Sequence, residues 1–176
     1  MSGDRANRPA RDGPGGDRPA HRPGERNGCK VDTQRLSRRV SRLRVVSDPD
    51  AAYDFIRQHF YIGRTQDMKG LVQLRGDDVI AAVIFDSFTT HNCFMHIASD
   101  GSKKWMTRHG LHEVFKYAFI TAGCERVTLW VEATNADSRA LVQGLGFTLE
   151  AVLHRAGRDG VDVLIYRMFR QECRYA

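Results

Sequence analysis

The stretch Cys124 to Phe147 combines residue types whose spacing suits binding chemistry. Val127, Leu129 and Val131 recur at every second position, which predicts a strand. The polar run Asn135-Ala-Asp-Ser138 follows directly, and an Asn in that place caps a helix by accepting a hydrogen bond from its first turn. The other N–H groups of that turn stay free, so they form a site for an anion or a carbonyl oxygen.

The helix predicted after Asn135 has a buried stripe and a defined end. Leu141, Val142 and Leu145 lie on one helical face, and the glycines of Gly144-Leu-Gly146-Phe147 stop the helix. Asn caps and Gly stops also occur in αβ units that bind nothing. The residues alone therefore leave a purely structural interpretation open beside a binding site.

Length and charge predict one folded domain with a basic extension. The chain has 176 residues and a net charge of +6, which suits one domain plus an appendage. Residues 1–40 hold ten Lys and Arg against five acidic residues, which leaves 17 basic against 16 acidic residues for the rest. The basic character therefore belongs to the extension, and residues 41–176 form a nearly neutral domain.

Residues 1–40 read as a disordered tail rich in Arg, Pro and Gly. Almost nothing apolar is present to bury between Met1 and Asn27. One interpretation is a basic arm that makes weak contact with nucleic acid or an acidic protein. The other is a solvated extension, which the lack of aromatic residues for base stacking favours.

The cysteines and the hydropathy pattern predict a cytoplasmic protein with reduced thiols. Cys29, Cys93, Cys124 and Cys173 form no C-x-x-C pair, and the chain shows no apolar core of a secretory signal. No apolar run approaches the roughly 18 residues that a membrane span requires. We therefore expect no membrane partner.

The remaining apolar patterns predict the element order β-α-β-β-β-α-β-α-β-β. Asp48-Pro49 is a good start for the first helix, and a stripe from Leu111 to Phe119 that ends before Gly123 predicts the second. The other apolar segments predict strands, at 43–46, 71–74, 79–88, 93–98, 127–131, 148–155 and 161–168. The order predicts an α/β sheet with helices on its faces.

The chain resembles the GCN5-related N-acetyltransferases from about Leu43 to Met168. The resemblance rests on this order of elements together with Asn135, Ser138 and Gly146-Phe147. The step Gly146-Phe-Thr-Leu-Glu150 and the strand Asp162 to Tyr166 are similar to the RimJ/RimL-like branch. The segments Asp86-Ser-Phe88 and Met95-His-Ile97 also look like short phage-carried members. The resemblance implies an acyl-CoA N-acyltransferase fold, an α/β fold with a mixed central sheet and helices on both faces.

The resemblance also implies acetyl-CoA as a cosubstrate, an amine acceptor and no metal. In that family the pantetheine arm pairs with exposed backbone of the fourth strand, which here is Phe94 to Ala98. Met95 and Ile97 are therefore expected at the cofactor. Asn135 and Ser138 are also expected to bind the cofactor, with Ser138 near its thiol.

The family's pyrophosphate loop corresponds to residues 102–107, Ser-Lys-Lys-Trp-Met-Thr. Trp105 and Thr107 stand where glycines are usual, and a bulky side chain hinders close approach of backbone to a phosphate. Lys103, Lys104 and Arg108 would compensate with positive charge, or are surface charges before a helix. Trp105 covers the cofactor or, as we favour, anchors the helix to the sheet.

Direct acetyl transfer needs a base for the amine and an acid for the leaving thiolate. His96 and Glu132 are the best candidates for the base, with Asp86 third, because strand ends near the splay face the acceptor. Each has an ordinary structural interpretation as a sheet histidine or a strand-end charge. Many relatives place a Tyr acid at the position of Val142, so Ser138 is the candidate at the thiol.

The resulting hypothesis is an N-acetyltransferase that transfers acetyl directly to a primary amine of a small molecule, peptide or protein. The alternative is a catalytically lapsed member that works as a binding or accessory protein, which Trp105, Thr107 and Val142 support. His109 and His112 have metal-ligand spacing but no companion ligands, so we interpret them as structural. We expect a monomer or a homodimer.

Overall fold

A computed structural model of the chain describes residues 43–176. The predicted basic tail of residues 1–40, with Cys29, lies outside the described residues.

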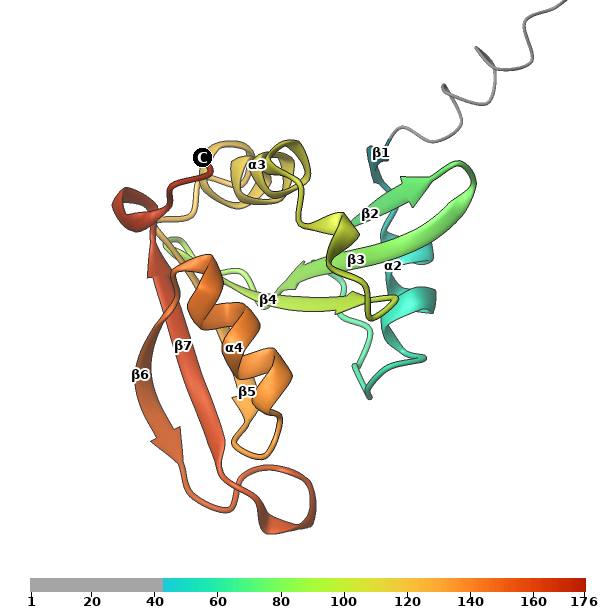
Figure 1. The fold of residues 1–176 in the computed structure, drawn as a ribbon. Coiled ribbons are helices and arrows are strands. Elements are labelled where there is room, and N and C mark those ends of the chain that lie inside the picture. The colour runs from blue at the N-terminus through green and yellow to red at the C-terminus, as the bar shows by residue number, and fades with distance from the viewer. Residues whose placement is uncertain (1–42) are drawn as a thin grey trace, which may run out of the picture. The chain divides into compact units, whose positions relative to one another are not determined.

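Seven strands form one sheet in the order β1-β2-β3-β4-β5-β7-β6 (Figure 1). Their bounds are β1 (Leu43–Ser47), β2 (Lys69–Arg75), β3 (Asp78–Asp86), β4 (Asn92–Ser99), β5 (Arg126–Glu132), β6 (Thr148–Leu153) and β7 (Val163–Phe169). Among the described strands, only the β4–β5 pair is parallel, and the other five pairs are antiparallel. The predicted mixed sheet is confirmed.

Three helices cover the two faces of the sheet. They are α2 (Pro49–Ile56), α3 (Arg108–Lys116) and α4 (Ala136–Leu145), with a π-helical turn, η2 (Tyr117–Thr121), continuing α3. Ile56 of α2 packs with Val72 and Ile84 on one face, whereas Phe115 of α3 and Leu145 of α4 belong to the core on the other. The ten predicted elements are present in the predicted order, with helices on both faces. Short 3₁₀ turns are η1 (Lys103–Trp105), η3 (Arg158–Gly160) and η4 (Arg170–Glu172).

The start of α2 lies directly on β2. Asp48 caps the helix by accepting a hydrogen bond from the Ala51 N–H at 2.9 Å, and Pro49 is its first residue. The Asp48 N–H donates to the Gly70 carbonyl at 3.0 Å. A Cβ atom on Gly70 would lie 2.7 Å from both the Pro49 Cα and the Ala52 Cβ. Gly70 therefore permits the close approach of helix and sheet.

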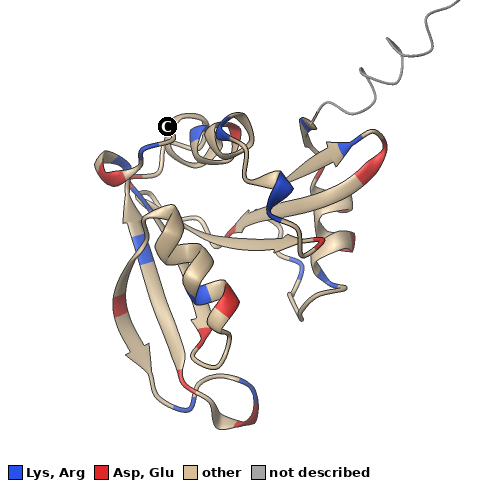
Figure 2. Ribbon diagram, in the orientation of Figure 1, with Lys and Arg blue, Asp and Glu red and all other residues tan. Residues whose placement is uncertain are grey.

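Charges of both signs are interspersed over the described elements (Figure 2). This agrees with the near balance of 17 basic and 16 acidic residues after residue 40. Within residues 43–176, no helix has the length and apolar character needed to cross a membrane. Strand β6 is a free edge of the sheet and all six of its residues are exposed.

Cys93 and Cys124 are free thiols buried in the core beside β4 and β5. Burial, together with the neighbouring Cys124 thiol, raises the pKa of Cys93 well above its usual range. The thiolate is the form of cysteine that reacts, and a reagent reaches these two buried thiols only when the core opens. We therefore expect Cys93 and Cys124 to react with iodoacetamide at least about a hundredfold more slowly in the native protein than in urea. Peptide mass spectrometry measures this, and equal rates in the two states would contradict the buried placement.

Candidate active site

Strands β4 and β5 diverge after a short paired stretch. They are in register only from Asn92 to Phe94 on β4, opposite Arg126 to Thr128 on β5. Beyond that stretch β4 continues beside β3, and β5 continues beside β7. Among the described strands, the edges that face each other across the gap therefore carry unpaired backbone groups, which suits an extended ligand rich in amides.

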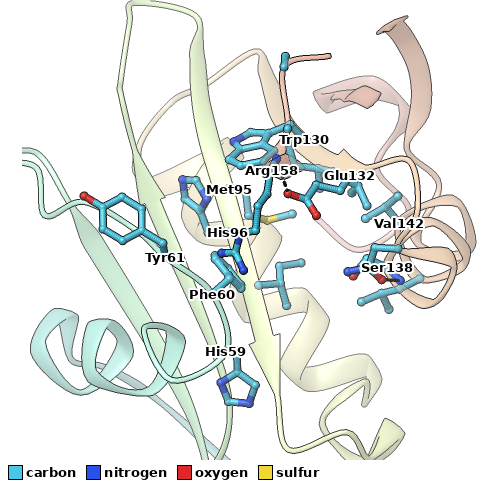
Figure 3. Close-up of a pocket in the computed structure, with 17 residues that line it drawn as sticks. His59, Phe60, Tyr61, Met95, His96, Trp130, Glu132, Ser138, Val142 and Arg158 are labelled. Atoms are coloured by element: carbon cyan, nitrogen blue, oxygen red, sulfur yellow. Dashed lines mark hydrogen bonds between the residues drawn. The ribbon is translucent and has the colours of Figure 1, made fainter. Parts of the chain in front are cut away.

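A cavity of about 460 Å³ occupies the gap (Figure 3). Its walls come from the segment that follows α2, both diverging strands, α4 with its cap, and the loop between β6 and β7. The lining residues are His59, Phe60, Tyr61, Met95, His96, Ile97, Leu129, Trp130, Val131, Glu132, Asn135, Ser138, Leu141, Val142, Ala156, Gly157 and Arg158.

The N-terminus of α4 opens onto this cavity. The Asn135 side chain accepts a hydrogen bond from the Ser138 N–H at 3.0 Å, as the sequence predicts. Gly146 ends the helix in the left-handed region, with φ of 104°, where a residue with a Cβ is strained. Ser138 is half-buried in the cavity wall. The helix thus presents a polar N-terminal turn to whatever the cavity binds.

His96 is paired with a buried carboxylate. Its Nε2 lies 3.2 Å from both oxygens of Asp86, whose residue is only 5% exposed at the end of β3. A neutral His96 that donates from Nε2 to Asp86 carries its lone pair on Nδ1. The pair therefore fixes an imidazole that can accept a proton.

Glu132 sits at the end of β5 and is engaged by the β6–β7 loop. Its Oε1 accepts a hydrogen bond from the Arg158 N–H at 3.1 Å, as the dashed line in Figure 3 shows. The loop, which includes the turn Arg158–Gly160, is thereby attached to the cavity wall.

A second cavity of about 370 Å³ adjoins the first. Tyr61, His96 and Trp130 line both cavities, and in the view of Figure 3 the His96 ring lies between the other two rings. The two cavities therefore share His96 as a wall residue. Asp86 lines only the second cavity.

The structure brings together six of the predicted site residues and leaves five elsewhere. Met95, His96, Ile97, Glu132, Asn135 and Ser138 line the first cavity. The residues outside it are Lys103, Lys104, Trp105, Thr107 and Arg108.

These five residues precede or begin α3. Trp105 is 2% exposed and belongs to the hydrophobic core, as the anchor interpretation expects. Thr107 caps α3 by accepting the Gly110 N–H at 3.0 Å. Lys103, Lys104 and Arg108 are exposed.

Several lining residues were missed from the sequence. His59, Phe60 and Tyr61 follow α2, and Arg158 lies in the β6–β7 loop. One signal was present for Trp130, because a large aromatic residue on the solvent-facing side of a strand is unusual.

Residues 43–176 contain no group of three or more His, Cys, Asp or Glu side chains arranged to hold a metal ion. Of the predicted structural histidines, His112 contacts the Tyr175 carbonyl through Nδ1 at 2.6 Å. It thus ties the C-terminal segment to α3.

Solved acetyltransferases share this architecture. The spermidine/spermine N-acetyltransferase SpeG from Vibrio cholerae, in complex with manganese ions, matches with a TM-score of 0.61 at 14% identity over 74% of this chain and 94% of that chain. Mutant forms of the same enzyme match with a TM-score of 0.62 at 13% identity, over 74% and 96%. A probable acetyltransferase matches with a TM-score of 0.53 at 15% identity, over 61% and 63%.

The chain has the fold of the GCN5-related N-acetyltransferases. The predicted acyl-CoA N-acyltransferase fold is thus confirmed, and identities this low carry the fold alone. No protein-family model and no curated protein matches the sequence.

Replacing Asn135 with alanine should lower the free energy of unfolding by about 1 kcal/mol, because the first turn of α4 loses its cap. The same change should weaken binding of a ligand that the cavity holds at that turn, since the turn faces the cavity. Urea unfolding and calorimetry measure the two effects. The matched control is Asp48→Ala, which uncaps α2 on the other face of the sheet and should cost similar stability without weakening binding. Equal losses of binding in both variants would contradict a specific role for Asn135.

Proposed function

We propose that the protein is an acyl-CoA-dependent N-acetyltransferase that transfers acetyl from acetyl-CoA to a primary amine of a small molecule, peptide or protein. The observation that carries this proposal is the cavity between β4 and β5, which combines unpaired strand edges with the capped N-terminus of α4. An extended chain of amides, such as the pantetheine arm, matches those edges.

The residues around the gap fit that cosubstrate. The β4 backbone at Met95 and Ile97 would pair with the arm, and the turn at Asn135 and Ser138 would lie at its thiol end. For the diphosphate, exposed Lys103, Lys104 and Arg108 supply positive charge beside the start of α3. The placement of Trp105 in the core removes its ring as an obstacle to the phosphates.

Acetyl-CoA supplies a thioester, whose C–S bond breaks as the new N–C bond to the amine forms. The amine must lose one proton and the CoA thiolate must gain one. His96 is suited to take the first proton on Nδ1, because Nε2 is directed to Asp86. Glu132 is the second candidate. Ser138 offers a hydroxyl hydrogen bond at the thiol end, since Val142 occupies the position where relatives carry Tyr.

The position of the loop before α3 favours a second candidate function, that of a binding or accessory protein. Lys103 to Arg108 do not line the cavity, and the loop lacks the glycines of the family pattern. A lapsed member that serves as a binding or accessory protein would show this feature, with the basic tail contacting nucleic acid or an acidic partner. From the sequence resemblance, we also propose that the chain is a RimJ/RimL-like or phage-type member. We propose a cytoplasmic location as well.

The test is amine-dependent release of free thiol from acetyl-CoA by the full-length protein. We expect turnover with at least one class of amine among alkyl, aryl, polyamine and peptide acceptors. Mass spectrometry of the product should show an amine heavier by one acetyl group. Binding of acetyl-CoA without turnover on any class would overturn the enzyme proposal in favour of the accessory protein.

A further inference from the structure

We propose that the second cavity is a binding site for a primary monoamine that carries an aromatic ring. The site rests on the proposed function, because such an amine would be the acetyl acceptor and would bind beside the gap that the thioester is proposed to occupy. Binding of the amine itself needs no acetyl-CoA, so the site can be tested separately.

The cavity contains one buried negative group. Asp86 is 5% exposed, and both of its oxygens lie 3.2 Å from the His96 Nε2. A carboxylate has about four lone-pair positions, so a single imidazole N–H leaves room for an ammonium group. A buried charge is stable only when it is well paired. An amine that enters as its cation supplies the partner that solvent cannot.

The rest of the wall is aromatic. Tyr61 and Trp130 are 84% and 44% exposed, and half-buried Phe94 completes the set. Aromatic side chains that line a cavity offer a ligand a large apolar face. Their flat faces suit an aromatic ring, and they also attract a cation.

The charge count argues against a polyamine. Asp86 is the sole acidic residue among the described residues that line this cavity, and Glu132 lines only the first. A polyamine carries several ammonium groups, each of which needs its own anion when desolvated. The Vibrio cholerae enzymes with this fold are named for spermidine and spermine. The lining of this chain favours an acceptor with a single positive charge.

Several contacts position the turn that follows Asp86. Ser87 follows it with φ of 49°, in the left-handed region that a non-glycine residue seldom occupies. The next amide, of Phe88, donates to the Asp67 carboxylate at 2.9 Å. Hydrogen bonds from Thr65 and Phe88 lower the pKa of Asp67, which is thereby committed to this turn. Arg64, between lining residues, pairs with Asp50 at 2.5 Å. These contacts position the turn that follows Asp86, next to His96.

The test is calorimetric titration of the full-length protein, without acetyl-CoA, with phenethylamine, hexylamine, spermidine and 2-phenylethanol. We expect phenethylamine to bind at least about tenfold more tightly than each of the other three, since only it combines one ammonium group with a ring. Asp86→Asn should weaken phenethylamine binding at least about tenfold. The control Asp77→Asn, at a fully exposed hairpin position, should leave it unchanged.

Tyr61→Ala provides a second variant that does not disturb the core, because Tyr61 is 84% exposed. It should reduce the preference for phenethylamine over hexylamine. Tighter binding of spermidine, or equal affinity for phenethylamine and hexylamine, would overturn the aromatic monoamine site. If either result were found and the protein acetylated spermidine, the proposed N-acetyltransferase function would still hold. Phenethylamine binding in a protein that ignores acetyl-CoA would instead support the site and contradict the enzyme.

Discussion

Replacing His96 with glutamine should lower kcat for acetyl transfer by about 10²- to 10⁴-fold, the range that a positioned general base contributes. Glutamine retains an N–H that can reach Asp86, but it cannot take up a proton near neutral pH. The KM for acetyl-CoA should change little, because the family's binding contacts on β4 are made by the backbone. Steady-state kinetics with a saturating amine measures both parameters.

The matched control is His109→Gln, on the exposed start of α3 and outside both cavities. It should retain the parent kcat. Glu132→Gln separates the two candidate bases, since the Arg158 N–H can still donate to a glutamine oxygen. A full loss in the Glu132 variant, with kcat preserved in the His96 variant, would assign the base to Glu132 instead.

Replacing Gly70 with alanine should lower the free energy of unfolding by about 3 kcal/mol, at the upper end for overpacking. The added Cβ would lie 2.7 Å from the Pro49 Cα and the Ala52 Cβ, and 3.2 Å from the Asp48 carbonyl oxygen. Backbone atoms cannot move aside as a flexible side chain can. The helix start must therefore lift from β2, with loss of packing around Ile56. Urea unfolding measures the change.

Gly144→Ala is the opposite case within the same fold. Gly144 lies in α4, where an added Cβ would meet no atom within 4 Å, and its φ is not in the left-handed region. Alanine should raise the unfolding free energy by up to about 1 kcal/mol, because it restricts the unfolded chain and favours the helix. A Gly70 variant as stable as the parent would contradict the close contact of α2 with β2.

Local signals made the fold readable from the sequence. Asp48-Pro49 starts a helix because a side-chain acceptor and a fixed φ satisfy its first turn, and Asn135 supplies the same kind of acceptor for α4. Gly146 ends α4 in a conformation that favours glycine. Each of these rules acts within a few residues, so the element order followed without knowledge of the sheet.

The membership of the site depended on contacts between distant segments. Tyr61, Trp130 and Arg158 line one cavity, which opens where β4 and β5 separate after three paired positions. No local sequence pattern sets the position at which the two strands separate. Whether the Trp105 side chain points into the core or toward a ligand likewise depends on how distant segments pack around it. The pairing of His96 with Asp86 follows from the β3–β4 register, which the sequence left unspecified.

The most direct test of the acyl-CoA site is calorimetric titration of acetyl-CoA into the full-length protein at moderate salt, with free CoA beside it. We predict one site with a dissociation constant in the micromolar range, and loss of binding in Ser138→Trp, whose side chain would fill the cavity at α4. Absence of measurable binding by the parent protein, or equal binding by the Ser138 variant, would contradict the assignment of the gap between β4 and β5 to acyl-CoA.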